Sequence, residues 1–372
     1  MASSQRQMVV TVLASLIVGA CAGVVASVWT SNALDRYATS LLGDRGFTAL
    51  EPRKPSTNPT DYADALRRVR DTQSRSLAVI TNKSLATGVP ERWIGPEDGV
   101  GLGAVVSANG WILTTQDQVL TITNPVTEAD VWVRGTRYAV SEVTRDTLTE
   151  FVLLKLTEAN GLSPLGFGSS DDAQNGDMVF VMPDALSFIP TTVQSSEHTR
   201  DFGPQPAEVF ATDWQLSLAA KVSGPVLSTT GDLLAFLTAD AAAIPFQHAA
   251  AFVQETLRSG VVAPAALGAY VIDVSEIYNL DPELRQGLNA GALVIAPTGR
   301  LAVPAKTPAA EAGLLAKDII TAVDGEAITS TTSLSEILTT YDPGQTARLS
   351  VVRGGAPIEI AVVLGDATAL VY

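Results

Sequence analysis

Few side chains in this chain of 372 residues have the chemistry for acid–base or nucleophilic catalysis near neutral pH. The sequence contains one cysteine, Cys21, and two histidines, His198 and His248. Two isolated histidines lack the spacing of an ordinary metal site, and the sequence has neither a phosphate-binding glycine loop nor a dinucleotide fingerprint. We therefore expect no metal and no cofactor.

The segment most suggestive of a reaction site is 220–227, which reads AKVSGPVL and offers the hydroxyl of Ser223. Hydrolysis by a serine requires an imidazole that takes its proton and a carboxylate that orients the imidazole. Neither histidine adjoins this segment: His198 follows a polar stretch, and His248 stands where a helical pattern begins. A hydroxyl is present, but the sequence gives it no adjacent base.

An uncharged segment near the start predicts a membrane anchor. Residues 8–29 read MVVTVLASLIVGACAGVVASVW, and as a helix they would extend about 33 Å, enough for a hydrocarbon core of roughly 30 Å. Arg6 precedes the segment, which favours a cytoplasmic N-terminus with the remaining domains outside, on the periplasmic or cell-surface side. A cleaved signal peptide and lipidation at Cys21 are the alternatives.

Composition limits the class of protein. A hydrophobic fraction of 46% indicates a globular chain, and a net charge of −15 argues against nucleic acid as a partner. With a single cysteine, no disulfide can form within the chain. Its stability must therefore come from packing.

The pattern of apolar runs and turn residues predicts a membrane anchor, a linker and two domains. Residues 1–30 form the anchor, 31–75 a linker with a short helix at 61–70, 76–262 the first domain and 263–372 the second. Short β-rich runs between turn residues predict antiparallel sandwich or barrel architecture in the first domain; these runs are 77–80, 103–106, 110–114, 129–133, 151–156 and 177–181. A helical pattern covers 247–258.

Beyond residue 264 the pattern changes to a small α+β module. It predicts strands near 268–274, 292–295, 319–323 and 347–353, with helices near 309–313 and 333–339. The loop at 261–264 is the expected boundary between the two domains.

Several motifs in this order resemble those of the HtrA (DegP-like) family. The first-domain motifs are GLGAVVSANGWILT at 101–114, EFVLLKL at 150–156 and GPVL at 224–227. The second domain carries LGAY at 267–270 and TPAAEAGL at 307–314, which resemble a PDZ domain. The resemblance implies a mostly β fold, with a trypsin-like double β-barrel and a small α+β PDZ domain after one N-terminal transmembrane helix. It also suggests a homotrimer.

The resemblance also indicates where a catalytic triad would stand. The histidine position falls on Gln118, or on Asp117 with one inserted residue, and the orienting acid falls on Glu150. The serine position falls on Val222, which places Ser223 one residue late. Glutamine cannot take a proton and valine cannot attack a carbonyl, so no catalytic residue is expected to be intact.

We therefore expect a membrane-anchored, extracytoplasmic protein whose protease domain is inactive. Its PDZ domain would bind peptide or protein C-termini through Leu267, Gly268, Ala269 and Tyr270, where the family has its carboxylate-binding loop. One alternative is an active serine endopeptidase in envelope protein quality control. Another is a structural or chaperone-like envelope protein.

Overall fold

The computed structural model describes residues 62–83, 99–146, 148–168, 173–199, 203–218, 222–259 and 264–370. The predicted anchor at 8–29 lies outside these residues. Within the part that the structure describes, no helix has both the length and the apolar character needed to cross a membrane.

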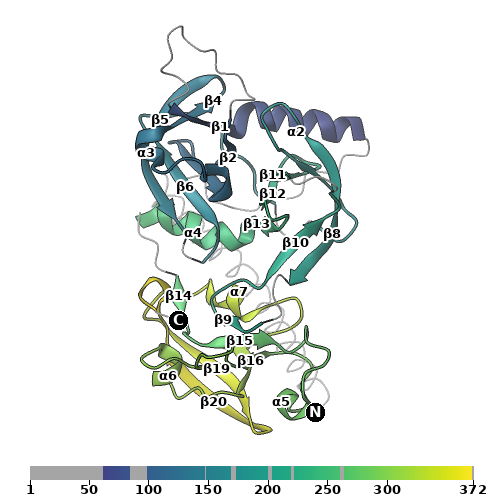
Figure 1. Ribbon diagram of the computed structural model, residues 1–372, viewed down its shortest axis with the longest axis vertical. Coiled ribbons are helices and arrows are strands. Elements are labelled where there is room, and N and C mark those ends of the chain that lie inside the picture. Colours follow the sequence, from purple (N-terminus) through teal and green to yellow (C-terminus); the bar gives the residue numbers. More distant parts are fainter. Residues whose placement is uncertain are drawn as a thin grey trace, which may run out of the picture. The chain divides into compact units, whose positions relative to one another are not determined.

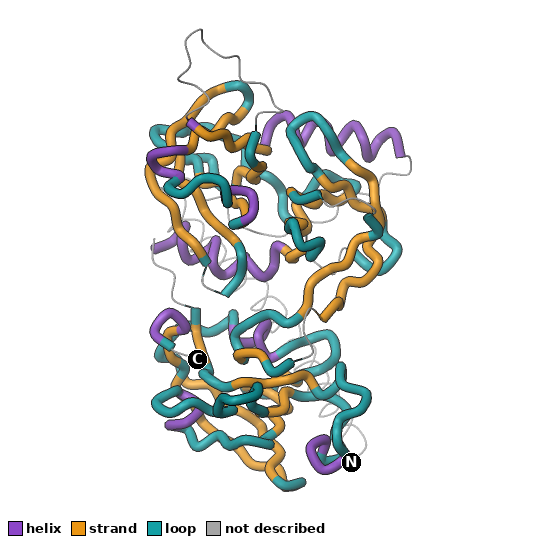
Figure 2. Tube along the Cα trace, in the orientation of Figure 1, coloured by secondary structure: helices purple, strands orange, loops and turns teal. Residues whose placement is uncertain are grey.

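Strands dominate the described part (Figure 2), and the first six close into an antiparallel barrel in the order β1-β2-β3-β6-β5-β4. These strands are β1 Leu77–Asn82, β2 Gly101–Val105, β3 Trp111–Thr115, β4 Ala129–Val133, β5 Thr136–Arg145 and β6 Phe151–Leu156. Every residue of β3 is buried. Successive side chains of a strand point to opposite faces, so Leu113 and Ile112 belong to two different hydrophobic clusters.

A second closed barrel has the order β10-β13-β12-β11-β7-β8. Its strands are β7 Met178–Val181, β8 Ile189–Thr199, β10 Thr212–Leu216, β11 Gly224–Ser228, β12 Leu233–Leu237 and β13 Ala243–Pro245. Trp214, Leu234 and Val226 are buried in one cluster of this barrel. Phe180 and Phe236 instead join the cluster that contains Leu113 of β3, which shows that the two barrels share a core.

In the described residues, short helical turns and two longer helices accompany the barrels. Between β3 and β4 lie the 3-10 turn η4 (Asp117–Val119) and the helix α3 (Pro125–Glu128). The helix α2 (Tyr62–Ser76) buries Ala65 and Val69, which are one helical turn apart, in the core shared by the barrels. The helix α4 (Phe246–Ser259) packs against the same core. The last element that the structure describes is the 3-10 turn η6 (Ala367–Ala369).

The C-terminal part is built on a seven-stranded sheet in the order β20-β19-β17-β16-β15-β9, with β18 paired to β17. Its strands are β9 Gln205–Pro206, β15 Tyr270–Asp273, β16 Ala292–Val294, β17 Ile319–Val323, β18 Glu326–Ala327, β19 Thr346–Arg353 and β20 Ala356–Val363, and a separate pair joins β14 Ala265–Ala266 to β21 Gly365–Asp366. The helices are α5 Pro282–Arg285, α6 Pro308–Glu311 and α7 Leu334–Leu338. The strand β9 comes from the connection between β8 and β10 of the second barrel.

The strands and helices predicted from apolar runs are present, with boundary shifts of a few residues. The prediction at 129–133 matches β4 and that at 319–323 matches β17. A tight turn joins β2 and β3, in which the Gly110 amide donates to the Ser107 carbonyl at 3.2 Å. The short helix predicted at 61–70 extends to Ser76.

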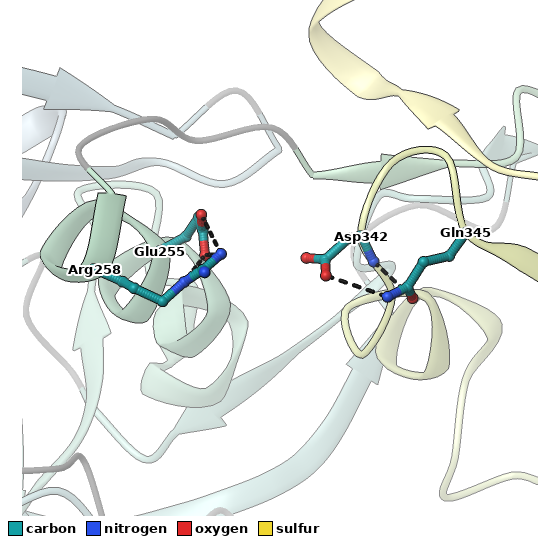
Figure 3. A network of polar contacts seen from close by, with 4 residues as sticks. All are labelled: Glu255, Arg258, Asp342 and Gln345. Atoms are coloured by element: carbon teal, nitrogen blue, oxygen red, sulfur yellow. Dashed lines mark hydrogen bonds and ion pairs between the residues drawn. The ribbon is translucent and has the colours of Figure 1, made fainter. Parts of the chain in front are cut away.

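Local polar networks hold helix ends and turns (Figure 3). Arg258 stands in the last turn of α4, and its Nη2 donates to both carboxylate oxygens of Glu255 at 2.8 Å. These hydrogen bonds raise the pKa of Arg258, and a cation in the last turn suits the negative end of the helix dipole. In the turn after α7, the Asp342 amide donates to Gln345 Oε1 at 3.1 Å, and Gln345 Nε2 donates back to Asp342 Oδ2 at 3.2 Å.

Candidate functional site

Gln118, at the expected histidine position, is buried and held from two sides. The turn η4 places it after β3, and its Oε1 accepts from the backbone amide of Leu102 at 2.8 Å. Its Nε2 donates to Ser223 Oγ, also at 2.8 Å. The backbone of Gln118 lies so close to Gly101 that a Cβ there would stand 2.2 Å from the Gln118 carbonyl oxygen. The absence of a side chain at Gly101 therefore permits the backbone position of Gln118.

Ser223, not Val222, is the residue that Gln118 contacts at the start of β11. Ser223 is half-buried, and Val222 packs against the hydrophobic cluster of the second barrel. The predicted serine position therefore holds a side chain that contributes to packing. Ala220, the first residue of the segment 220–227, lies outside the described residues.

The other two predicted positions have structural contacts of their own. Asp117 accepts hydrogen bonds from Thr115 Oγ1 and, at 3.0 Å, from the backbone amide of Ala239. Glu150 is half-buried immediately before β6, and its carbonyl accepts from the Gln116 amide at 2.8 Å. The Asp117 contacts join η4 to the loop before β13.

The two histidines lie in regular secondary structure. His248 is buried in the first turn of α4 and stacks on Phe210, with ring centroids 3.8 Å apart and an interplanar angle of 10°. His198 lies in β8, opposite Asp213 of β10. Within the described residues, the side chain that hydrogen-bonds to the Ser223 hydroxyl is thus the amide of Gln118. An amide nitrogen is a donor only.

The loop 267–270, predicted to bind a carboxylate, is held by a left-handed glycine and by backbone hydrogen bonds. Gly268 has φ +75°, and a Cβ at this position would stand 2.6 Å from Thr307 Cβ. The Leu267 carbonyl accepts from the Ala309 amide at 2.8 Å, and the Tyr270 amide donates to the Ala302 carbonyl at 2.8 Å. These contacts fix the loop.

A small pocket is lined by residues of β15, which continues this loop, and by residues at the start of the helix α7. A capping box in which Ser333 and Glu336 satisfy each other's backbone amides starts α7. Leu334, at the start of the helix, is buried in the core of this domain. Asp273, at the end of β15, accepts from Ser275, but burial is the larger effect and raises the pKa of its carboxyl.

One further residue at this loop was not predicted from the sequence. Glu208 is buried, and its Oε1 accepts from the Gly268 amide at 2.6 Å. The two residues are 60 positions apart in the chain. No local pattern around Glu208 indicates this contact.

Comparison of the sequence with known proteins gives matches to both domains. A family model described as PDZ domain matches residues 264–364. The chain is 27% identical over 276 residues to a probable periplasmic serine endoprotease DegP-like of Bartonella henselae, covering 71% of this chain and 52% of that protein. It is 24% identical over 305 residues to the periplasmic pH-dependent serine endoprotease DegQ of Escherichia coli, covering 77% of this chain and 64% of DegQ.

Solved structures show the same fold. The HtrA-type protease AlgW with a decapeptide matches with a TM-score of 0.56 at 21% identity, covering 82% of this chain and 99% of that one. AlgW with a tripeptide matches with a TM-score of 0.55 at 18% identity, covering 82% and 97%. The chain spans only 52% and 64% of the length of the two curated relatives.

Proposed function

Because the chain belongs to the HtrA/DegP family of trypsin-like serine proteases with a PDZ domain, we propose that it binds peptides and does not hydrolyse them. The barrels keep the protease fold without a working triad. The PDZ domain binds the C-termini of peptides or proteins.

One observation carries the proposed loss of hydrolysis: the hydrogen bond between Gln118 Nε2 and Ser223 Oγ at 2.8 Å. A general base must lie within hydrogen-bond reach of the proton that it takes and must have a basic atom there. Gln118 presents a donor to the hydroxyl, and its oxygen is already bonded to the Leu102 amide. The Ser223 proton therefore has no acceptor on this side chain.

The packing of Val222 supports the same conclusion. The family motif places the nucleophile at this position, and here an isopropyl group joins a hydrophobic cluster. A hydroxyl one residue later starts from a different backbone position on a tight loop. Productive attack requires the reacting atoms about 3–3.5 Å apart and aligned, which a shift of one residue disrupts.

Peptide binding rests on the loop 267–270 and the strand β15. A PDZ domain adds an extended peptide to a sheet edge and binds its terminal carboxylate with backbone amides. The Gly268 amide already donates to a carboxylate, that of Glu208. This contact supports anion recognition by the loop.

The proposed location follows from the relatives and from the N-terminal sequence. Both curated relatives are named periplasmic proteases. We place the barrels and the PDZ domain outside the cytoplasm, held to the membrane by residues 8–29. In this setting the protein would bind envelope proteins, as a homotrimer or as another oligomer.

Incubation of the full-length chain with fluorescein-labelled casein tests the loss of hydrolysis. We expect the rate of fluorescence release to equal that of Ser223→Ala. Ser217→Ala is the matched control, because Ser217 is another serine of the second barrel and its backbone bonds to Thr192. Turnover that Ser223→Ala abolishes and Ser217→Ala retains would establish the alternative, a serine endopeptidase of envelope quality control.

A further inference from the structure

The edge strand of the PDZ groove already has a neighbour from the same chain. The strand β9 pairs antiparallel with β15, with Pro206 opposite Tyr270 and Gln205 opposite Val271 (Figure 1). It belongs to the connection between β8 and β10 of the second barrel. The edge to which a peptide would add is therefore occupied.

The two residues after β9 form hydrogen bonds with the loop 267–270. The Ala207 amide donates to the Ala269 carbonyl at 2.9 Å, and Glu208 Oε1 accepts from the Gly268 amide at 2.6 Å. Ala207 and Glu208 are each 2% exposed. A carboxylate with so little exposure is stable only when it is hydrogen-bonded, so this contact is a requirement of the buried position.

The Ala207 side chain fills the apolar part of the groove. It belongs to the same buried cluster as Leu267 of the loop and as Leu334 and Leu338 of α7. Beside the segment, between β15 and α7, a cavity of about 50 Å³ remains.

A peptide bound to a PDZ domain makes three contacts: backbone pairing with the edge strand, a side chain in the pocket, and a terminal carboxylate at the loop amides. Residues 205–208 make all three, with the side chain of Glu208 in place of a chain terminus. We propose that this segment is an internal ligand of the groove. A partner with a free C-terminal carboxylate then binds only when the segment has left.

This inference rests on the proposed peptide binding and specifies its partner. The occupant indicates that the groove accepts an extended segment whose last residue has a small apolar side chain like that of Ala207, followed at once by a carboxylate. A tethered segment has an effective concentration in the millimolar range. The apparent affinity for a free peptide is the affinity of the open groove multiplied by the fraction of molecules in which the groove is open. The segment therefore selects for partners that are abundant or bind tightly.

The test uses a fluorescein-labelled peptide with the sequence of residues 203–207, Gly-Pro-Gln-Pro-Ala, ending in a free carboxylate. Its binding to the full-length chain is measured by fluorescence anisotropy. We expect Glu208→Ala to bind it roughly 10- to 100-fold more tightly than the unmodified chain, because the mutation removes a charge-assisted hydrogen bond from the closed state. Glu208→Gln keeps the size of the side chain and should give a smaller gain. Glu326→Ala, which removes an exposed carboxylate on β18, is the matched control and should change nothing.

A second experiment measures how far residues 205–208 occupy the groove when no peptide is added. Hydrogen exchange of the Ala207 amide should be slow in the unmodified chain and faster in Glu208→Ala by a factor similar to the gain in affinity. The same peptide with an amidated C-terminus should bind neither variant, because it lacks the carboxylate.

Each outcome separates this inference from the function on which it rests. Equal affinity of the unmodified chain and Glu208→Ala, or fast exchange of Ala207 in the unmodified chain, would overturn the internal ligand and leave peptide binding intact. Failure of every variant to bind the free-carboxylate peptide would overturn both proposals.

Discussion

Gly268 allows a direct test of how the binding loop is built, through the substitution Gly268→Ala. The new methyl group would stand 2.6 Å from Thr307 Cβ and 2.9 Å from Thr307 Cγ2. Thr307 cannot retreat easily, because its hydroxyl donates to the Pro304 carbonyl at 2.8 Å and accepts from the Ala310 amide at 3.3 Å, which caps α6. The clash therefore falls on both the loop and the start of the helix.

The expected loss of stability has two parts. The left-handed backbone at φ +75° costs a residue with a Cβ about 1–2 kcal/mol. Overpacking against the buried Thr307 adds about 1–3 kcal/mol. The sum is about 2–5 kcal/mol, a large fraction of the stability of a small domain.

Gly299→Ala is the matched control for the backbone part. Gly299 has φ +80°, and a Cβ there would meet nothing within 4 Å. This variant should lose only the backbone contribution of about 1–2 kcal/mol. The difference between the two variants therefore isolates the contact with Thr307.

Hydrogen exchange in the full-length chain measures both losses within the PDZ domain. The amides of Tyr270 and Ala309 are bonded within and next to the loop, and their protection reports the opening free energy of this region. We expect exchange of both to be roughly 5- to 150-fold faster in Gly268→Ala than in Gly299→Ala, which corresponds to about 1–3 kcal/mol. Equal rates in the two variants would refute the argument that the loop is packed against Thr307.

Two further predictions concern the stability of the PDZ domain. Arg353 donates to both carboxylate oxygens of Asp318, which is 1% exposed, at 2.7 and 2.6 Å. Urea unfolding should show that Arg353→Met lowers the free energy of unfolding by about 2–4 kcal/mol, because it leaves a buried charge without its partner. The exposed control Arg348→Met should lower it by only about 0–1 kcal/mol, and equal losses in the two variants would contradict this prediction. Burial, and a hydrogen bond to Asp324 at 2.7 Å, raise the pKa of Tyr341 to about 12. A raised pKa means that folding favours the protonated tyrosine. The unmodified chain should therefore be more stable than Tyr341→Phe below pH 10 and should lose that advantage as pH rises from 10 to about 12, which thermal unfolding across this range measures. A difference in stability between the two chains that stays constant with pH would be inconsistent with the raised pKa of Tyr341.

Several strands with apolar runs could be predicted from the sequence, although β12, with the sequence LLAFL and every residue buried, was not among them. β6, with the sequence FVLLKL, has five buried residues of six and stands out at once. β5 is mostly exposed along TRYAVSEVTR, and β8 reads IPTTVQSSEHT. Neither was predicted, because their position depends on hydrogen bonding to neighbouring strands in a closed barrel and not on their own composition.

The candidate sites divide in the same way. The loop 267–270 was proposed from its own motif, LGAY, and the structure places the left-handed Gly268 in it, while its role in binding stays a prediction. The contact of Gln118 with Ser223 joins residues 105 positions apart, and that of Glu208 with Gly268 joins residues 60 positions apart. Such pairs depend on the folding of the whole domain, and a motif that centres on Val222 gives no indication that its neighbour makes the contact.

The most direct test of the proposed lack of hydrolysis asks whether any serine of the chain is activated. A fluorophosphonate reacts with a serine hydroxyl only when a neighbouring base takes the proton of the hydroxyl. The covalent adduct is itself the readout, so the test needs no substrate and no turnover. With the full-length chain and intact-mass spectrometry, we expect no adduct, because the partner of Ser223 is the amide of Gln118. An adduct mapped to Ser223 and absent from Ser223→Ala would contradict the proposal.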